Sequence, residues 1–191
     1  MTLRRTVIVV ALANLAYFVV ELHFGRIYNS VALIGDSVDF LEDASVNILI
    51  FLAIGWSLAR RQRVSYLLAL LLLIPGIAFL WNAIRQFADP QTPDGAGMGW
   101  VGFGALLVNV SCAFLIARHK SEEGGLVVAA YYSARNDAIA NILIIIAGLI
   151  TVSTAEVWPD LLTGIVIFAL NSTAAKEIIT AARREEKDHR A

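Results

Sequence analysis

The stretch EDASVNILI at residues 42–50 recurs almost unchanged as NDAIANILI at residues 136–144. Both copies read Asp-Ala-x-x-Asn-Ile-Leu-Ile, and both lie inside long apolar runs. An ionisable residue at the centre of such a run is costly inside a bilayer and is therefore a candidate for a functional group. The repeat thus connects the fold of this chain with the chemistry of its acidic residues.

The composition of the chain indicates a membrane protein. Of its 191 residues, 58% are hydrophobic and only 16% are charged, and the mean hydropathy is +0.70. Soluble domains usually carry about 25% charged residues. The net charge of −1 gives no attraction to nucleic acid, and the single Cys112 allows neither an internal disulfide nor a multi-cysteine metal cage.

Six apolar segments are long enough to cross a bilayer, which takes about 20 residues each. We predict them at Thr6–Phe24, Val31–Ala59, Tyr66–Phe87, Met98–Ala117, Leu126–Val152 and Trp158–Ala182. The expected fold is therefore an all-α membrane protein with a six-helix transmembrane domain over residues 1–182. A short charged tail follows at residues 183–191.

The distribution of basic residues predicts the orientation. Arginine and lysine concentrate at residues 4–5, 60–63, 118–120 and 183–190, whereas only Arg26 and Arg85 lie near the other side. Because basic residues are enriched in cytoplasmic loops, both termini are expected in the cytosol. The chain is then a multi-pass protein of the cell inner (cytoplasmic) membrane.

The repeated motif defines a repeated helix face. At about 100° per residue, positions spaced by four residues fall within a stripe about 80° wide. These positions are Asp39, Asp43 and Asn47 in the first copy and Ser133, Asp137 and Asn141 in the second. Asp36 joins the first stripe, nearer the outer surface, whereas Glu42 points about 100° away from Asp43.

The two aspartates of the repeat are expected at the same depth. Asp43 lies about 18 Å from the outer end of its span and Asp137 about 16 Å from the inner end of its own, at a rise of 1.5 Å per residue. The two helices run antiparallel, so both acids come near the midplane. Facing each other, they would form a small anionic cage that a divalent cation neutralises and that protons occupy when the metal leaves, as in a cation/proton exchanger.

Three longer stretches carry a resemblance to a known family. NLAYFVVELHFGRIYNSVALIGDSVDFLEDA at 14–44, YYSARNDAIANILIIIAGLI at 131–150 and WPDLLTGIVIFAL at 158–170 resemble helices one and two, five and six of the cation diffusion facilitators. The first stretch has an acid late in helix one (Glu21), a Ser-x-Ala-Leu start to helix two, and Asp36 three residues before a four-spaced pair of acids.

The resemblance implies a site and a function. In the family, helices two and five each supply a four-spaced pair of metal ligands, which here are Asp39 and Asp43 with Ser133 and Asp137. The implied function is a secondary transporter rather than an enzyme, which moves divalent cations out of the cytosol in exchange for protons. Zinc is the first expectation, with cadmium or cobalt also carried, and no separate cofactor is implied.

Two departures from the family pattern modify these expectations. Ser133 stands where the family usually has histidine, so the site lacks a nitrogen donor and is harder than a usual zinc site. Manganese or iron is therefore the alternative cargo. The family's C-terminal cytosolic domain does not follow the last span, so a homodimer is expected to form through the transmembrane helices.

Other interpretations of the same residues remain open. The three aspartates could be protonated and only join helices, and Ser133 could be a small packing residue. An intramembrane aspartyl enzyme with Asp43 and Asp137 as its dyad, or a non-transporting metal-binding membrane protein, would also place acids at this depth.

Further polar residues are expected to have structural roles. We expect hydrogen bonds between helices from the amides, pairing of Arg135 with nearby acids, and solvated histidines at or beyond the membrane edges. Exposed tryptophans are expected at the interfaces. The amides are Asn47, Asn136 and Asn141, and the acids near Arg135 are Glu21, Asp36 and Glu42. The histidines are His23, His119 and His189, and the tryptophans are Trp81, Trp100 and Trp158.

Overall fold

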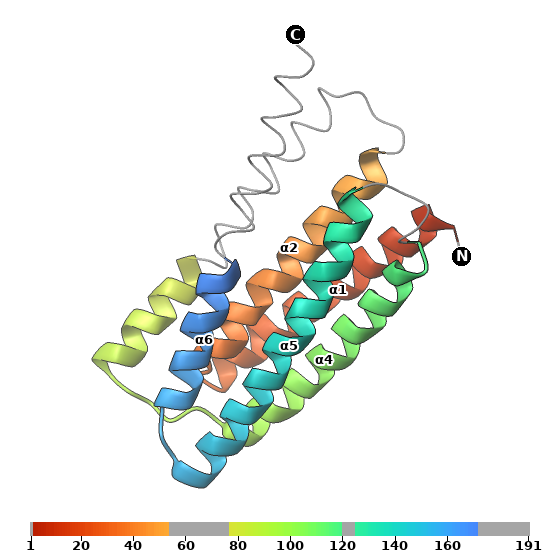
Figure 1. Ribbon diagram of the computed structural model, residues 1–191. Helices are drawn as coiled ribbons and strands as arrows, with labels where there is room; N and C mark the ends of the chain where they lie inside the picture. The colour runs from red at the N-terminus through yellow and green to blue at the C-terminus, as the bar shows by residue number, and fades with distance from the viewer. Residues whose placement is uncertain (1, 54–76, 120–124, 172–191) are drawn as a thin grey trace.

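All regular structure in the described part of the chain is helical. The computed structural model describes residues 2–53, 77–119 and 125–171 (Figure 1). The helices are α1 (Leu3–Ile27), α2 (Val31–Ala53), α4 (Gly95–Ala117), α5 (Gly125–Thr154) and α6 (Trp158–Asn171), and residues 77–88 are also helical. The expected all-α class is confirmed.

The observed helices coincide with the predicted spans to within a few residues wherever both are described. The predicted residues 54–59, 66–76 and 172–182, and the charged tail at 183–191, lie outside the described residues. Within the described part, three helical segments are long and apolar enough to cross a membrane: Leu3–Ile27, Gly95–Ala117 and Ser133–Thr154. Helix α2 has sufficient length but carries four acidic residues, more than any other described helix.

The helices lie side by side as a bundle, and two of the described connections are short turns (Figure 1). Residues 28–30 connect α1 to α2, and residues 155–157 connect α5 to α6. Helix α2 packs against α1, α5 and α6, and α4 packs against α1 and α5. The helix that carries most of the acids therefore has protein neighbours on several sides.

Close backbone approach holds α4 against α5. A Cβ atom built on Gly148 would lie 2.6 Å from the carbonyl oxygen of Gly95, and one built on Gly95 would lie 2.6 Å from the carbonyl oxygen of Gly148. Small residues permit such packing between membrane helices, where dispersion and hydrogen bonds replace the hydrophobic effect. In addition, the Tyr17 hydroxyl donates to the carbonyl oxygen of Val101 at 2.6 Å, which joins α1 to α4.

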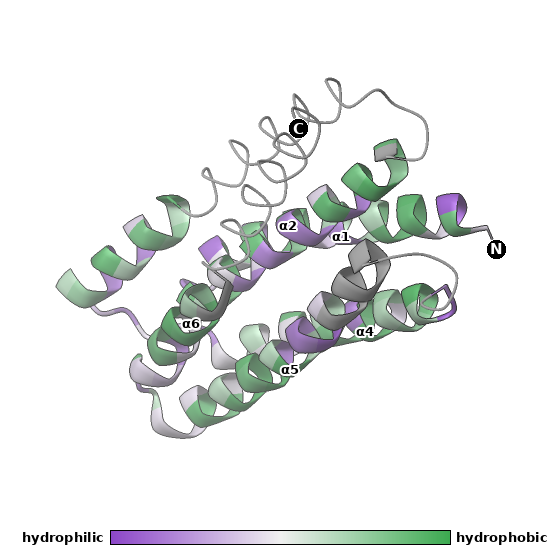
Figure 2. Ribbon diagram, turned by 45° about the horizontal axis from the view of Figure 1, so that its top comes forward, coloured by the Kyte–Doolittle hydropathy of each residue, from purple (hydrophilic) through white to green (hydrophobic). Residues whose placement is uncertain are grey.

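Polar residues point inward and large apolar residues point outward. Figure 2 shows polar segments within the otherwise apolar helices α2 and α5. Several acids and amides are buried, whereas Trp81, Trp100 and Trp158 are exposed, as an interfacial belt requires. The interior also contains apolar clusters, but buried acids together with many exposed large apolar side chains suit a protein surrounded by lipid.

Candidate functional site

The acidic stripe of α2 faces the protein interior. Asp36, Asp39 and Asp43 expose 0%, 5% and 4% of their surface, and Asn47 exposes 1%. Glu42, on the neighbouring face, is only half-buried. The four-residue spacing therefore places the three aspartates on one buried side of the helix, as 3.6 residues per turn require.

The matching stripe of α5 also faces inward. Asp137 and Asn141 are buried, and Ser133 is half-buried. Asp43 lies twelve residues after the start of α2, and Asp137 lies twelve residues after the start of α5. At 1.5 Å per residue, each acid is about 18 Å from the beginning of its helix.

Two hydrogen bonds set the register between α2 and α5. The Ser133 hydroxyl donates to Asp43 Oδ1 at 2.8 Å, and the Asn141 amide donates to Asp36 Oδ2 in a short contact. Asp39 is four residues before Asp43, and Asp137 is four residues after Ser133. In antiparallel helices, these two aspartates therefore face each other, one turn from the serine.

The three aspartates form one electrostatic group. The charge of Asp39 acts on Asp137, and that of Asp137 on Asp43. Both carboxylate oxygens of Asp39 lack a hydrogen-bond partner among the described residues. Buried, mutually repelling carboxylates with few donors are unstable unless protons or a cation neutralise them.

The aspartates are not yet arranged as a closed metal cage. Among the described residues, no group of three or more His, Cys, Asp or Glu side chains is placed to hold a metal ion together. The Ser133 hydroxyl directs its proton to Asp43, and it also lies beside Asp137. A metal at this place would replace that hydrogen bond and draw the carboxylates of α2 and α5 closer.

A second polar group lies one to two turns nearer the beginning of α2. Glu21 of α1 and Asp36 of α2 are fully buried, and their carboxyl groups are near neighbours. Apart from the Asn141 amide, no donor among the described residues reaches them. Asn109 of α4 donates to Asn141 Oδ1 at 2.9 Å, so this group joins α1, α2, α4 and α5. Asn141 thus has the interhelical role expected for it.

The other amides differ from the expectation. The Asn47 amide donates to the Asp43 carbonyl oxygen of its own helix at 2.8 Å. Asn136 is exposed and accepts from the adjacent Arg135 at 3.3 Å. Among the described contacts, these two residues bond within their own helices, although Asn47 itself is buried on the inward stripe of α2.

Glu21 is fully buried with no hydrogen-bond partner among the described residues, and Asp36 accepts from Asn141, so these two acids do not confirm the expected pairing with the exposed Arg135. Pairing of Arg135 with Glu42 stays a prediction. The expectation for His119 is wrong. His119 was expected in solvent, but it is buried, with Nε2 3.1 Å from the Thr6 hydroxyl oxygen. It follows α4 directly and folds back against the start of α1. His23 is exposed and meets the edge of Phe24, and His189 lies outside the described residues.

The sequence reasoning missed Asp160. The sequence indicates no role for this residue, but it lies in the first turn of α6 and is fully buried. It accepts hydrogen bonds from the Ser30 hydroxyl and from the backbone of Val31 and Ala32. The only signal in the sequence was Ser30, a good N-cap residue before an apolar run. That signal does not reveal a partner 130 residues away.

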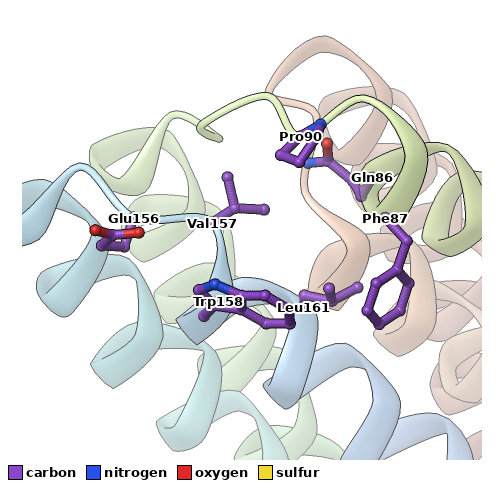
Figure 3. Close-up of a pocket in the computed structure, with 7 residues that line it drawn as sticks. All are labelled: Gln86, Phe87, Pro90, Glu156, Val157, Trp158 and Leu161. Carbon is purple, nitrogen blue, oxygen red and sulfur yellow. The ribbon is translucent and has the colours of Figure 1, made fainter.

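A small pocket lies elsewhere, at the end of the bundle where α5 is joined to α6 (Figure 3). It lies beside the start of α6 and the end of the 77–88 helix, and most of its lining is apolar. Its lining residues are Gln86, Phe87, Pro90, Glu156, Val157, Trp158 and Leu161. None of the aspartates of α2 or α5 lines it, so it is separate from the acidic group.

The described fold and its buried acids define an all-helical membrane protein with a carboxylate-lined interior. A model of the cation efflux transmembrane domain matches residues 7–184, which is nearly the whole sequence. The chain therefore belongs to the cation efflux family, the cation diffusion facilitators that its motifs resemble. The matched domain is described as a cation efflux transmembrane domain, and no enzymatic activity is part of that description.

Individual relatives agree with the family. The zinc transporter ZitB of Escherichia coli (strain K12) is 27% identical over 168 residues, which cover 81% of this chain and 53% of the relative. ZitB of Pectobacterium atrosepticum is 29% identical over 151 residues, covering 72% and 47%. The cadmium, cobalt and zinc/H(+)-K(+) antiporter of Bacillus subtilis (strain 168) is 24% identical over 169 residues, covering 81% and 54%. The chain spans about half the length of these relatives.

Proposed function

We propose that this chain is a secondary transporter that moves divalent transition-metal cations out of the cytosol in exchange for protons. It acts as a multi-pass protein of the cytoplasmic membrane, with both termini in the cytosol. Family membership and the zinc, cadmium and cobalt named for its relatives support this cargo class. Those names describe the relatives, and the assignment to this chain is an inference.

The observation that carries the proposal is the group of three buried aspartates between α2 and α5. Asp39, Asp43 and Asp137 are brought together at half the depth of their helices, with Ser133 hydrogen-bonded to Asp43. We assign the cargo to these four residues. A divalent cation would neutralise most of the charge of the three carboxylates, and protons would replace it after release.

The donor set decides the choice among metals. All four groups offer oxygen only, which suits manganese or iron better than a site with imidazole would. Zinc nevertheless accepts carboxylate oxygens at about 2.0–2.2 Å. We therefore propose zinc as the first cargo, with cadmium or cobalt also carried, and manganese or iron as the alternative. A homodimer formed through the membrane helices remains an expectation from the resemblance.

Metal flux into sealed vesicles tests the proposal. The purified chain is reconstituted with a metal-sensitive dye and a pH-sensitive dye inside, and zinc is added outside at two pH gradients. The account predicts zinc entry accompanied by proton exit, and loss of both in Asp43→Asn. Ser45→Ala is the matched control, because Ser45 is buried on the same helix but bonds only to the Leu41 carbonyl oxygen in the described contacts.

Each contrary result is informative. Zinc binding without flux would make the protein a metal-binding scaffold and not a transporter. Zinc flux with no proton movement at any pH would remove proton exchange while leaving metal transport. Full flux in Asp43→Asn would remove the carboxylate site.

A further inference from the structure

Asp160 of α6 completes the beginning of α2. Its Oδ1 accepts from the Ser30 hydroxyl at 2.6 Å and from the Ala32 amide at 3.0 Å, and its Oδ2 accepts from the Val31 amide at 2.7 Å. Ser30 in turn accepts from the Leu33 amide at 3.1 Å. The first three amides of α2 thus have partners, and two of those partners are supplied by a different helix.

This arrangement differs from an ordinary helix cap. The first amides of a helix lack intrahelical acceptors, and a nearby side chain of the same segment usually accepts from them. Helix α4 follows that pattern, because Asp94 immediately precedes it and accepts from the Gly97 amide at 3.0 Å. At α2, the accepting carboxylate comes from α6, so the bond is a connection between helices as well as a cap. The negative charge also suits the positive end of the α2 dipole.

Backbone contact makes this connection tight. A Cβ atom built on Gly164 would lie 2.9 Å from the Ala32 nitrogen and 2.9 Å from the Val31 carbonyl carbon. The Val31 Cγ1 atom lies at the same 2.9 Å, so α6 packs directly on the first turn of α2 at this point. This packing supports the hydrogen bonds that the Asp160 side chain accepts nearby.

The position of α2 at its start decides where its aspartates point. Asp39 and Asp43 lie eight and twelve residues after Val31 on one continuous helix. A rotation of α2 by one residue would turn its aspartates by about 100°, away from Asp137. The bonds from Asp160 fix both the rotation and the depth of the first turn, and the helix transmits that placement to the acids.

We propose that Asp160 is a positioning residue for the metal site: it links α6 to the start of α2 and so holds α2 in the rotation that presents Asp39 and Asp43 to Asp137. This role rests on the proposed transport function. Breaking the connection would leave a buried carboxylate and two buried amides without partners, which is costly.

The test compares two aspartate caps at the same end of the bundle. Asp160→Ala and Asp160→Asn are measured beside Asp94→Ala, which removes the cap of a helix that carries no acidic residue. For each, the amount of folded protein, the thermal midpoint, the zinc affinity and the kcat and KM of zinc transport per folded molecule are determined. Asn retains one acceptor oxygen, so its effect should lie between those of Asp160→Ala and the wild type.

The expected result is a loss of zinc affinity and transport of about tenfold or more in Asp160→Ala, since misplaced groups can lose a hundredfold. Asp94→Ala should change zinc affinity and transport by less than about twofold, although loss of this cap lowers stability by about 1 kcal/mol. If the effect were only a general loss of stability, Asp160→Ala and Asp94→Ala would both give less folded protein, but their zinc affinities would not differ. Ser30→Ala, which removes one bond to Asp160, replaces Asp160→Ala if the latter does not fold.

The outcomes separate this proposal from the one on which it rests. Zinc flux in the wild type that persists unchanged in Asp160→Ala, Asp160→Asn and Ser30→Ala would overturn the positioning role alone. Equal losses of affinity in the Asp160 and Asp94 variants would overturn it as well, by showing a general effect of capping. Absence of zinc binding and flux in the wild type would overturn both proposals.

Discussion

Replacing Asp137 with Asn separates stability from metal binding. The substitution keeps the size of the side chain and removes one negative charge from the group shared with Asp39 and Asp43. Without metal, that charge is repelled by its neighbours, and the Ser133 hydroxyl beside it offsets only part of this repulsion. The metal-free variant should therefore be as stable as the wild type or more stable, as is common where a site is built for function.

In the presence of metal, Asp137→Asn should lower the affinity for zinc. Removing one partner of a buried charge pair costs about 3–5 kcal/mol, and each 1.4 kcal/mol corresponds to about tenfold in affinity. We therefore expect zinc to bind at least about a hundredfold more weakly. At a zinc concentration of about 100 times the wild-type Kd, the wild type gains about 2.7 kcal/mol, whereas the variant gains only about 0.4 kcal/mol.

Thermal unfolding in lipid nanodiscs measures both effects. The thermal midpoint is recorded with and without zinc for the wild type, for Asp137→Asn and for the control Ser45→Ala. The wild type and the control should show the same upward shift with zinc, and Asp137→Asn should show almost none. A metal-free midpoint well below that of the wild type, with the zinc shift intact, would refute the reasoning and make Asp137 a structural residue.

The remaining predictions concern one ligand and one packing contact. Ser133→His should shift transport toward zinc over manganese. It should also weaken metal binding below about pH 6.5, where imidazole takes up a proton. Ser133→Ala should reduce transport far less than loss of Asp43 does. Competitive uptake of the two metals measures this, and unchanged selectivity in both variants would make Ser133 a packing residue. Gly148→Ala should lower stability by about 1–3 kcal/mol, because its Cβ would meet the Gly95 carbonyl oxygen at 2.6 Å. Gly99→Ala, which meets nothing within 4 Å, should be neutral in the same unfolding assay.

The faces of the helices could be predicted from the sequence, whereas their register could not. The four-residue spacing of Asp39 and Asp43, and of Ser133 and Asp137, fixes which side of each helix is polar. That polar sides turn inward follows from the cost of charge in lipid. Which residues of α2 and α5 contact each other depends on the offset of the two helices along their axes. Two hydrogen bonds between side chains, Ser133 to Asp43 and Asn141 to Asp36, define that offset.

Residues near helix ends were the hardest to predict. His119 and Asp160 both lie just outside or just inside a helix, where the sequence cannot distinguish a solvated side chain from one folded back against a neighbour. His119 contacts Thr6, and Asp160 contacts Ser30, in each case across more than a hundred residues of sequence. Helical periodicity carries no information about such contacts, because they depend on how the ends of separate helices meet.

The ligands of zinc bound to the purified chain test the central claim most directly. X-ray absorption at the zinc edge is recorded on the wild type and on Asp43→Asn. The account predicts one zinc per chain, surrounded only by oxygen at about 2.0–2.2 Å, and loss of that zinc in Asp43→Asn. Sulfur at about 2.3 Å, the scattering signature of imidazole, or full retention of zinc in Asp43→Asn would contradict a site built from Asp39, Asp43, Asp137 and Ser133.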